Sequence, residues 1–169
     1  MPGWTKPTSR APICAGPIFT EAHLGFATFD DADMTGANLT SAELWCASLQ
    51  GTNLTMATLD YAEASGIHAM GADLSFARLF DADFSEADLS DANLTYATLV
   101  GTKLERATLT GCNVYGISVW VDGAEQSRLI IGRDDASPFM VDDIEVAQFV
   151  HLLLNHRKLR KAIDAVAEC

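Results

Sequence analysis

The chain is short of basic residues. Its 169 residues include 11 Lys and Arg against 23 Asp and Glu, which leaves a formal net charge of -12 and an isoelectric point near 4.5. Such a surface repels nucleic acid and anionic membranes, and it favours basic partners, such as a protein that normally grips DNA. We therefore expect the partner to be another protein, with no binding to nucleic acid or to a membrane.

Long hydrophobic runs are also lacking. The most apolar run, from Phe149 to Leu154, is far too short to span a bilayer. The N-terminus carries Lys6 and Arg10 but no apolar stretch before Pro12, so we expect no secretory signal. Together with the cysteine usage below, these absences predict a cytoplasmic protein.

Cysteine is sparse, and no pattern of metal ligands is present. The four cysteines, at positions 14, 46, 112 and 169, form no C-x-x-C pair, which argues against a zinc site or a disulfide framework. His151 and His156 are five residues apart and not at the i, i+4 spacing of a helical metal pair. No glycine-rich phosphate loop and no catalytic constellation is found. The sequence therefore predicts no metal, no cofactor and no enzymatic activity.

What the chain has in abundance is a five-residue repeat. Twenty repeats have centres spaced by five residues from Leu24 to Val119; sixteen centres are Leu, Phe or Met, and fifteen positions two before the centre are Ala. A period of five fits neither an α-helix nor a plain β-strand. One large and one small residue of each repeat are expected inside, where stacked coils share a continuous core. The pattern predicts a solenoid, and the resemblance described next implies that it is an all-β solenoid.

The sequence of the repeat resembles the motif of a known protein family. The stretches ADMTG, ANLTS, ADLSF, ADFSE, ADLSD and ANLTY closely match A(D/N)Lxx, the motif of the pentapeptide repeat family. The resemblance covers roughly 100 of the 169 residues. It implies a right-handed quadrilateral β-helix with four repeats per coil, a number that the period alone does not provide. About five coils then make a rod ~25 Å long.

Two neighbouring centres depart from the pattern. Ala64 and Ala69 stand where a large side chain is usual, while Ile67 replaces the small residue between them and Phe84 occupies the same column one coil later. We interpret this as compensation of volume in the core and not as a binding cavity. A local kink or a widened coil at residues 65–70 is the alternative.

Two kinds of outward residue are candidates for an interaction surface. They are an apolar set and an acidic wall. Met56, Phe76 and Tyr96 form one outward apolar column, and Phe80, Val100 and Trp120 form another on the adjoining face; in the acidic wall, Glu43, Glu63 and Asp83 stack in one column and the other members lie nearby. The apolar set consists of Met56, Phe76, Phe80, Tyr96, Val100 and Trp120. The acidic wall consists of Asp30, Asp31, Glu43, Glu63, Asp83, Glu86, Asp88 and Asp91. The apolar set is either covered by the chain's own C-terminal segment or open to a dimer or another partner.

The period divides the chain into three regions. Residues 1–18 are a proline-containing extended segment or cap, residues 19–121 are the repeat rod, and residues 122–169 are a C-terminal strand plus helical segment. Strands are possible at residues 128–131 and 139–141. Helical spacing then places Val146, Phe149, Val150, Leu153, Leu154, Leu159 and Ile163 on apolar faces, which suit a cap or a homodimer.

A second resemblance concerns the segment after the repeats. The runs VYGISVW, GAEQSRLII and VDDIEVAQFVHLLLN look like the region that follows the repeats in certain bacterial pentapeptide proteins, where a Toll/interleukin-receptor-like domain often comes next. The resemblance implies either a stand-alone protein or one module of a longer one.

These observations leave three hypotheses for function. The first is a non-enzymatic scaffold that binds another protein, possible partners being a signalling effector or DNA gyrase. The second is a DNA mimic that binds DNA gyrase or topoisomerase and protects it from inhibitors, a function that the family resemblance implies. The third, a hydrolase that uses the acidic wall, is the least favoured, because a solenoid wall offers no deep pocket in which to shift a pKa.

Overall fold

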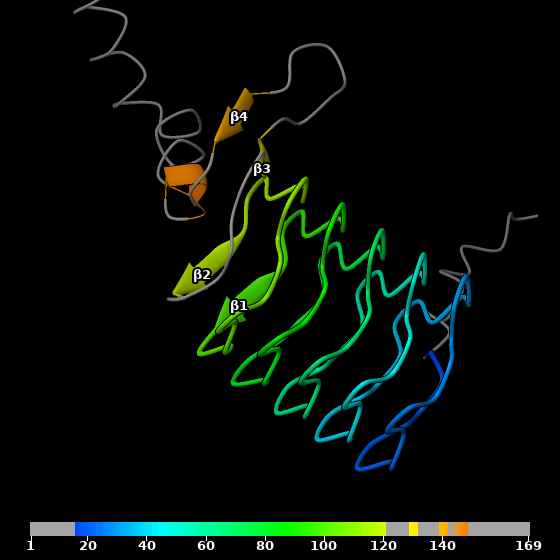
Figure 1. The fold of residues 1–169 in the computed structure, drawn as a ribbon. Helices are drawn as coiled ribbons and strands as arrows, with labels where there is room; N and C mark the ends of the chain where they lie inside the picture. Colours follow the sequence, from blue (N-terminus) through cyan, green and yellow to red (C-terminus); the bar gives the residue numbers. More distant parts are fainter. Residues whose placement is uncertain (1–15, 121–128, 132–138, 142–143, 145, 149–169) are drawn as a thin grey trace, which may run out of the picture.

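The computed structural model describes residues 16–120, 129–131, 139–141, 144 and 146–148. Residues 16–120 wind into a stack of four-sided coils, seen edge-on in Figure 1. Parallel bridges join each ladder residue, which is the residue just before a centre, to the residue twenty positions later. The first bridges of the four ladders are Ile18 to Asn38, His23 to Glu43, Thr28 to Ser48 and Asp33 to Asn53. Four repeats therefore close each turn of the rod.

Continuous strands of three residues occur in the last described coils of the rod and after it. Strand β1 (Thr98–Val100) pairs in parallel with β2 (Ser118–Trp120) in the same twenty-residue register. Strands β3 (Leu129–Ile131) and β4 (Phe139–Val141) form a separate antiparallel pair. Both were expected as strands, and in the described part of the chain they pair with each other instead of extending the parallel ladders.

A short helical stretch follows β4. Residues 144 and 146–148 are helical; Ile144 and Ala147 are buried members of the hydrophobic core, whereas Val146 is 45% exposed. The remaining residues of the expected apolar faces, Phe149, Val150, Leu153, Leu154, Leu159 and Ile163, lie outside the described residues, as does the N-terminal segment 1–15. The C-terminal cap or dimer contact therefore stays a prediction.

Every repeat uses its backbone in the same way. In the repeat centred on Leu24, the N–H of Leu24 donates to the backbone carbonyl of Glu43 at 2.7 Å. The N–H of Phe26 donates to the backbone carbonyl of Trp45 at 3.1 Å. The N–H of Glu43 donates to the carbonyl of Ala22 at 2.9 Å, and within the turn the N–H of Ala27 donates to the carbonyl of Leu24 at 3.0 Å. Each coil is thus tied to its neighbours along all four sides.

The second residue after each centre has a positive φ. Thirteen non-glycine residues take this conformation, with φ between 52° and 62°. A β-turn with positive φ only at its third position has the φ pattern of type II, in which glycine is favoured because it has no Cβ. Gly71 takes the same position with a φ of 67° and has open space around it, so the preference for glycine there reflects backbone conformation and not crowding.

The ladder residue completes the hydrogen bonding of the turn. Wherever it is Asp or Asn, its Oδ1 accepts a hydrogen bond from the N–H two residues later; the N–H of Thr55, for example, donates to Asn53 Oδ1 at 3.0 Å. The same contact is made by Asp33, Asn38, Asp73, Asp83, Asp88, Asn93 and Asn113. This is the Asx interaction that mimics a backbone turn, and it explains the D/N of the motif.

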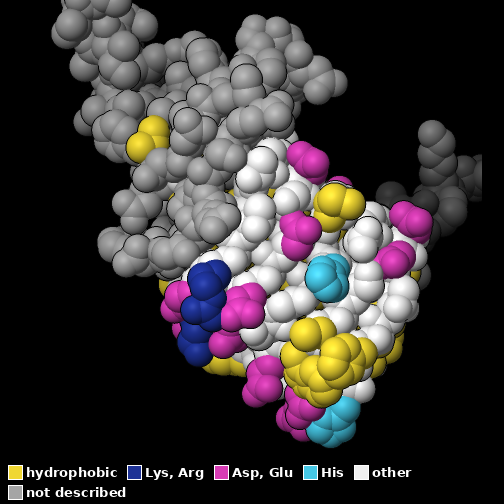
Figure 2. All heavy atoms as spheres, viewed as in Figure 1, with side chains coloured by type: hydrophobic (Ala, Val, Ile, Leu, Met, Phe, Trp, Pro, Cys, Tyr) yellow, Lys and Arg dark blue, Asp and Glu magenta, His cyan; other side chains and the backbone are white. Residues whose placement is uncertain are grey.

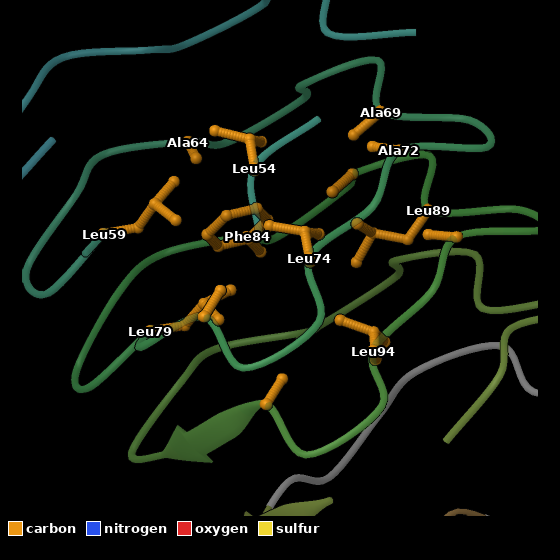
Figure 3. Close-up of a cluster of buried hydrophobic side chains, with 14 of the residues drawn as sticks. Leu54, Leu59, Ala64, Ala69, Ala72, Leu74, Leu79, Phe84, Leu89 and Leu94 are labelled. Carbon is orange, nitrogen blue, oxygen red and sulfur yellow. The ribbon is translucent and has the colours of Figure 1, made fainter. Parts of the chain in front are cut away.

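The core follows the predicted inward pattern. The inward alanines and large centres from Met34 to Val114 are buried. Ala64 and Ala69 are buried as well, and Figure 3 shows the ring of Phe84 in the interior close to Ala64. Ala64 donates its N–H to Asp83 at 2.8 Å, which sets Phe84 one coil beyond it in the same column. The largest fully buried side chain among the described residues thus stacks on one of the smallest.

Three residues that replace the inward alanine are polar. Thr52, Thr102 and Cys112 donate to the centre carbonyls of Phe29, Leu79 and Leu89, twenty-three residues earlier, at 2.7, 2.6 and 2.9 Å. Burial of a hydroxyl or thiol is tolerated here because each one finds an acceptor. These departures from Ala therefore belong to the core and not to a binding site.

Candidate functional site

A hollow of about 580 Å³ lies on one side of the rod. Its charged residues are Glu63, Asp83 and Lys103, which are successive members of one ladder, together with Asp81. Its aromatic residues are Trp45 and Tyr61. The ladder residues come from a flat side of the coil, while Trp45, Tyr61 and Asp81 come from the turns that border it. We call this feature the acidic hollow.

Charge in the acidic hollow is unbalanced. Lys103 pairs with Asp83 at 3.2 Å, and no Lys or Arg in the described part of the chain pairs with Glu63 or Asp81. Burial raises the pKa of Asp83, but hydrogen bonds from Ser85 and the ion pair with Lys103 outweigh it and hold the pKa below the usual 3.8. Three carboxylates therefore face a single ammonium group.

The same ladder continues beyond the hollow to a histidine. His23 Nδ1 lies 2.7 Å from a carboxylate oxygen of Glu43, which is the ladder neighbour of Glu63. The hydrogen bond to Glu43 and the charge of that carboxylate raise the pKa of His23 above its usual 6.5. Glu43 thus has a partner that Glu63 lacks.

Neighbouring rings hold the two aromatic side chains of the hollow. Trp45 is 40% exposed and packs edge to face on Phe26, with ring centroids 4.7 Å apart. Tyr61 is 54% exposed and packs on Phe80 in the same manner, with centroids 5.9 Å apart. Such contacts orient both rings while leaving much of their surface open to a ligand.

The members of the predicted acidic wall differ in the contacts that they make. Glu43, Glu63 and Asp83 stand in one ladder, whereas Asp88 stands in another, and both Asp83 and Asp88 accept backbone hydrogen bonds of their own turns. Glu86 pairs with Arg106. Figure 2 shows acidic side chains around the gathered basic ones on one face of the molecule.

Three other members of the wall lie at turns. Asp30 accepts hydrogen bonds from the Ser48 hydroxyl at 2.6 Å and from the Gln50 N–H at 3.0 Å. Asp31 and Asp91 extend over glycines of the next coil, since a Cβ added at Gly51 or Gly111 would meet their carboxylate oxygens. Much of the rod's acidity therefore also has a role in the backbone of the turns.

The residues of the apolar set lie in two columns of the rod. Met56, Phe76 and Tyr96 are exposed in one turn column, where the rings of Phe76 and Tyr96 stack with centroids 5.2 Å apart. Phe80 is exposed and contacts Tyr61 at the acidic hollow. Val100 pairs in register with Trp120, whose side chain lies outside the described part of the structure.

The two described cysteines differ in their exposure. Cys46 is exposed at a turn, and Cys112 is buried. Burial raises the pKa of the Cys112 thiol to about 12, and Cys112 donates to a carbonyl oxygen. A thiol of that kind is not a nucleophile at neutral pH.

The sequence alone did not point to Trp45, Tyr61, Asp81 or Lys103. Tyr61 and Asp81 share one turn column, but Trp45 and Lys103 stand at other repeat positions, so no single column contains all four. Placing the twenty-residue coils side by side, with turn columns beside ladder columns, would have found them.

Metal centres and membrane-spanning helices are two further features considered for the described residues. No group of three or more His, Cys, Asp or Glu side chains there is arranged to hold a metal ion. Within the same residues, no helix is long and apolar enough to cross a membrane.

Comparison with known proteins agrees with the repeat geometry. The family model for pentapeptide repeats matches residues 18–55, 47–85 and 72–111, with 8 copies. These overlapping segments together cover more than half of the 169 residues. No curated protein sequence gives a significant match.

Several solved structures are similar to this chain. Rfr23, a pentapeptide repeat protein from the cyanobacterium Cyanothece 51142, is 30% identical over 56% of this chain and 58% of its own, with a TM-score of 0.47. HetL, a pentapeptide repeat protein involved in heterocyst differentiation regulation in Nostoc sp. strain PCC 7120, is 27% identical over 73% and 62%, with a TM-score of 0.25. Trypsin-treated QnrB1, a plasmid-mediated fluoroquinolone resistance protein, is 20% identical over 63% and 64%, with a TM-score of 0.32. The chain thus spans about three fifths of each of these proteins.

Proposed function

Because this chain belongs to the pentapeptide repeat family, whose members form right-handed quadrilateral β-helices, we propose that it is a non-enzymatic scaffold that binds a basic surface of another protein. Proteins of this family are in general structural or interaction proteins. The rod supplies a rigid support, and the partner is recognised by side chains that point outward from it.

The distribution of charge on the rod carries this proposal. Residues 19–121 contain 14 Asp and Glu but only Arg78, Lys103 and Arg106 as basic residues. Each of these bases is already paired, with Asp60, Asp83 and Glu86 respectively. Negative charge therefore predominates on a surface that the inter-coil hydrogen bonds hold in place, which lowers the entropy cost of binding.

Affinity capture with charge-reversed variants tests the proposal. The wild type is compared with Glu43→Lys/Glu63→Lys and with Glu21→Lys/Glu105→Lys, which makes the same change of net charge outside the acidic hollow. We expect the wild type and the second variant to retain a basic protein from the host lysate, and the first variant to lose it. Retention should also fall as salt is raised. Capture that is equal for all three proteins and insensitive to salt would contradict the proposal.

The same charge favours a second candidate function, the mimicry of DNA toward DNA gyrase or topoisomerase. One ladder sets the acidic side chains of Glu43, Glu63 and Asp83 on three successive coils, as phosphates are set along a duplex. A supercoiling assay with and without ciprofloxacin tests this function. Inhibition of supercoiling, or protection of the enzyme from the drug, would support mimicry. No effect at micromolar protein would remove it and leave the scaffold in place.

The C-terminal segment is proposed to cap the rod or to join two copies of it. The burial of Ile144 and Ala147 in the hydrophobic core supports a packing role for the first turn of this segment. Size-exclusion chromatography with light scattering distinguishes a cap from a dimer contact, because only a dimer contact doubles the mass.

A further inference from the structure

The acidic hollow has a shape and composition of its own within the acidic rod. Its volume of about 580 Å³ lies in the range of 300–1,000 Å³ that is common for ligand pockets. It is built from three successive coils, because its ladder residues Glu63, Asp83 and Lys103 are each twenty positions apart. The hollow therefore accommodates more than a single ion, and a side chain with part of its backbone fits this size.

The charges of the hollow require a cation. Of its three carboxylates, only Asp83 has a basic partner among the described residues, namely Lys103. Glu63 stands in the ladder between Glu43 and Asp83, so its two nearest ladder neighbours are also acidic. A positive group placed beside Glu63 and Asp81 would relieve this repulsion and gain charge-assisted hydrogen bonds.

The aromatic rings specify what kind of cation fits. Trp45 and Tyr61 are oriented by Phe26 and Phe80 and remain about half exposed at the hollow. Aromatic faces attract Arg and Lys through their π-electrons, and the planar guanidinium of Arg also stacks on the ring. The described residues contain no metal-binding group, which separates this site from a divalent cation site. Two rings beside carboxylates match an arginine side chain best.

We infer that the acidic hollow binds an arginine side chain of the partner protein, with the guanidinium between Trp45 or Tyr61 and the carboxylates of Glu63 and Asp81. This inference rests on the proposed function and names the group that the rod recognises. Asp83 already forms an ion pair with Lys103, so the arginine of the partner pairs with Glu63 and Asp81 instead.

A pair of peptides tests the inference. The probe is a fluorescein-labelled Gly-Gly-Arg-Gly-Arg-Gly-Gly peptide, and its match has Lys in place of both Arg. Fluorescence anisotropy at low salt measures binding to the full chain, and the indole N–H signal of Trp45, assigned with Trp45→Phe, reports on the hollow. We expect the Arg peptide to bind several-fold more tightly than the Lys peptide and to shift the Trp45 signal.

Variants of the hollow and one control complete the test. Glu63→Gln and Trp45→Ala should each weaken binding of the Arg peptide, by about tenfold. Trp45→Phe should restore most of the loss, since an aromatic face remains. Glu21→Gln removes one negative charge outside the hollow and should change affinity by less than about twofold. Circular dichroism confirms that each variant folds.

The outcomes separate this inference from the proposed function. Equal losses for Glu63→Gln and Glu21→Gln, equal binding of the Arg and Lys peptides, or no shift of the Trp45 signal would overturn the arginine site. The scaffold would still stand if capture of a basic protein depended on charge. If capture failed while the Arg peptide bound as expected, the scaffold would fall and the arginine site would remain.

Discussion

At the scale of single residues, the Asp or Asn of the repeat has a structural purpose. Its carboxylate or amide oxygen accepts the N–H two residues later, a group that the inter-coil ladders leave unpaired. Where the ladder residue is Ser48 or Arg78, that N–H is accepted by Asp30 or Asp60 of the preceding coil. The acidity of the rod is thus partly a by-product of how its turns are built.

Removal of one such oxygen should lower stability measurably. Asn53→Ala deletes the acceptor of the Thr55 N–H and is expected to cost about 1 kcal/mol of the free energy of unfolding, similar to the loss of a helix cap. Asn53→Asp keeps the acceptor and should cost much less. Denaturant unfolding measures both, with Thr58→Ala as the control at a ladder position without this contact. Equal effects of the three changes would show that the contact contributes nothing.

A second residue-scale prediction concerns His23. Its pKa is raised by Glu43, so the stabilisation from this pair is present below pH 6.5 and is lost as the pH rises through the higher pKa of the folded state. Titration of the imidazole by NMR should give a pKa above 6.5, and Glu43→Gln should return it toward 6.5. An unchanged midpoint in Glu43→Gln would mean that the ion pair does not form in solution.

At the scale of the coil, core positions that depart from the usual side-chain size compensate for one another in volume. Ala64 leaves space in its coil, and Phe84 of the next coil is the largest fully buried side chain. Interiors are packed as densely as organic crystals, so the volume missing at one position is supplied by a neighbour. The alternation is therefore a property of two stacked coils and not of either repeat alone.

A double-mutant cycle tests this compensation. Phe84→Ala should cost about 3–5 kcal/mol because it opens a cavity, and Ala64→Leu should cost about 1–3 kcal/mol because it overpacks the core. The two changes together should cost less than their sum by about 1 kcal/mol or more. Ala64→Leu combined with Leu109→Ala, in another column and coil, should be additive. Additivity in both pairs, measured by denaturant unfolding, would contradict the packing argument.

At the scale of the whole molecule, like charges oppose the compact rod. The net charge of -12 is spread over a chain whose three rod bases are already paired. Salt screens this repulsion, because the Debye length falls from ~30 Å at ~0.01 M to ~3 Å at ~1 M. The same field attracts a basic partner, so it acts against stability and in favour of association.

Thermal unfolding in sodium chloride should therefore show stabilisation by salt. We expect the melting temperature to rise between ~0.01 M and ~0.5 M, since loss of repulsion outweighs weakening of the exposed ion pairs. Glu43→Lys/Glu63→Lys, which is less negative, should show a smaller rise. A melting temperature that falls with salt in both proteins would mean that the ion pairs dominate.

The sequence alone determined which residues are inside the rod. Ala and Leu recur every five residues because a coil that is stacked on others needs one small and one large side chain per side, and this pattern is local enough to read along the chain. It also predicted strands at residues 128–131 and 139–141, which the structure has at Leu129–Ile131 and Phe139–Val141. The number of repeats per coil came from family resemblance, since a period of five does not say how many sides close a turn.

Only the tertiary structure decided which outward residues meet. The acidic hollow combines residues of one ladder column, of the neighbouring turn column and Trp45, and their meeting depends on the twenty-residue register and on how far the turns project beside the ladder. The register follows from hydrogen bonds between distant parts of the backbone, which no local pattern encodes. The repeat therefore specifies the rod, and the stacking of its coils brings the residues of the acidic hollow together.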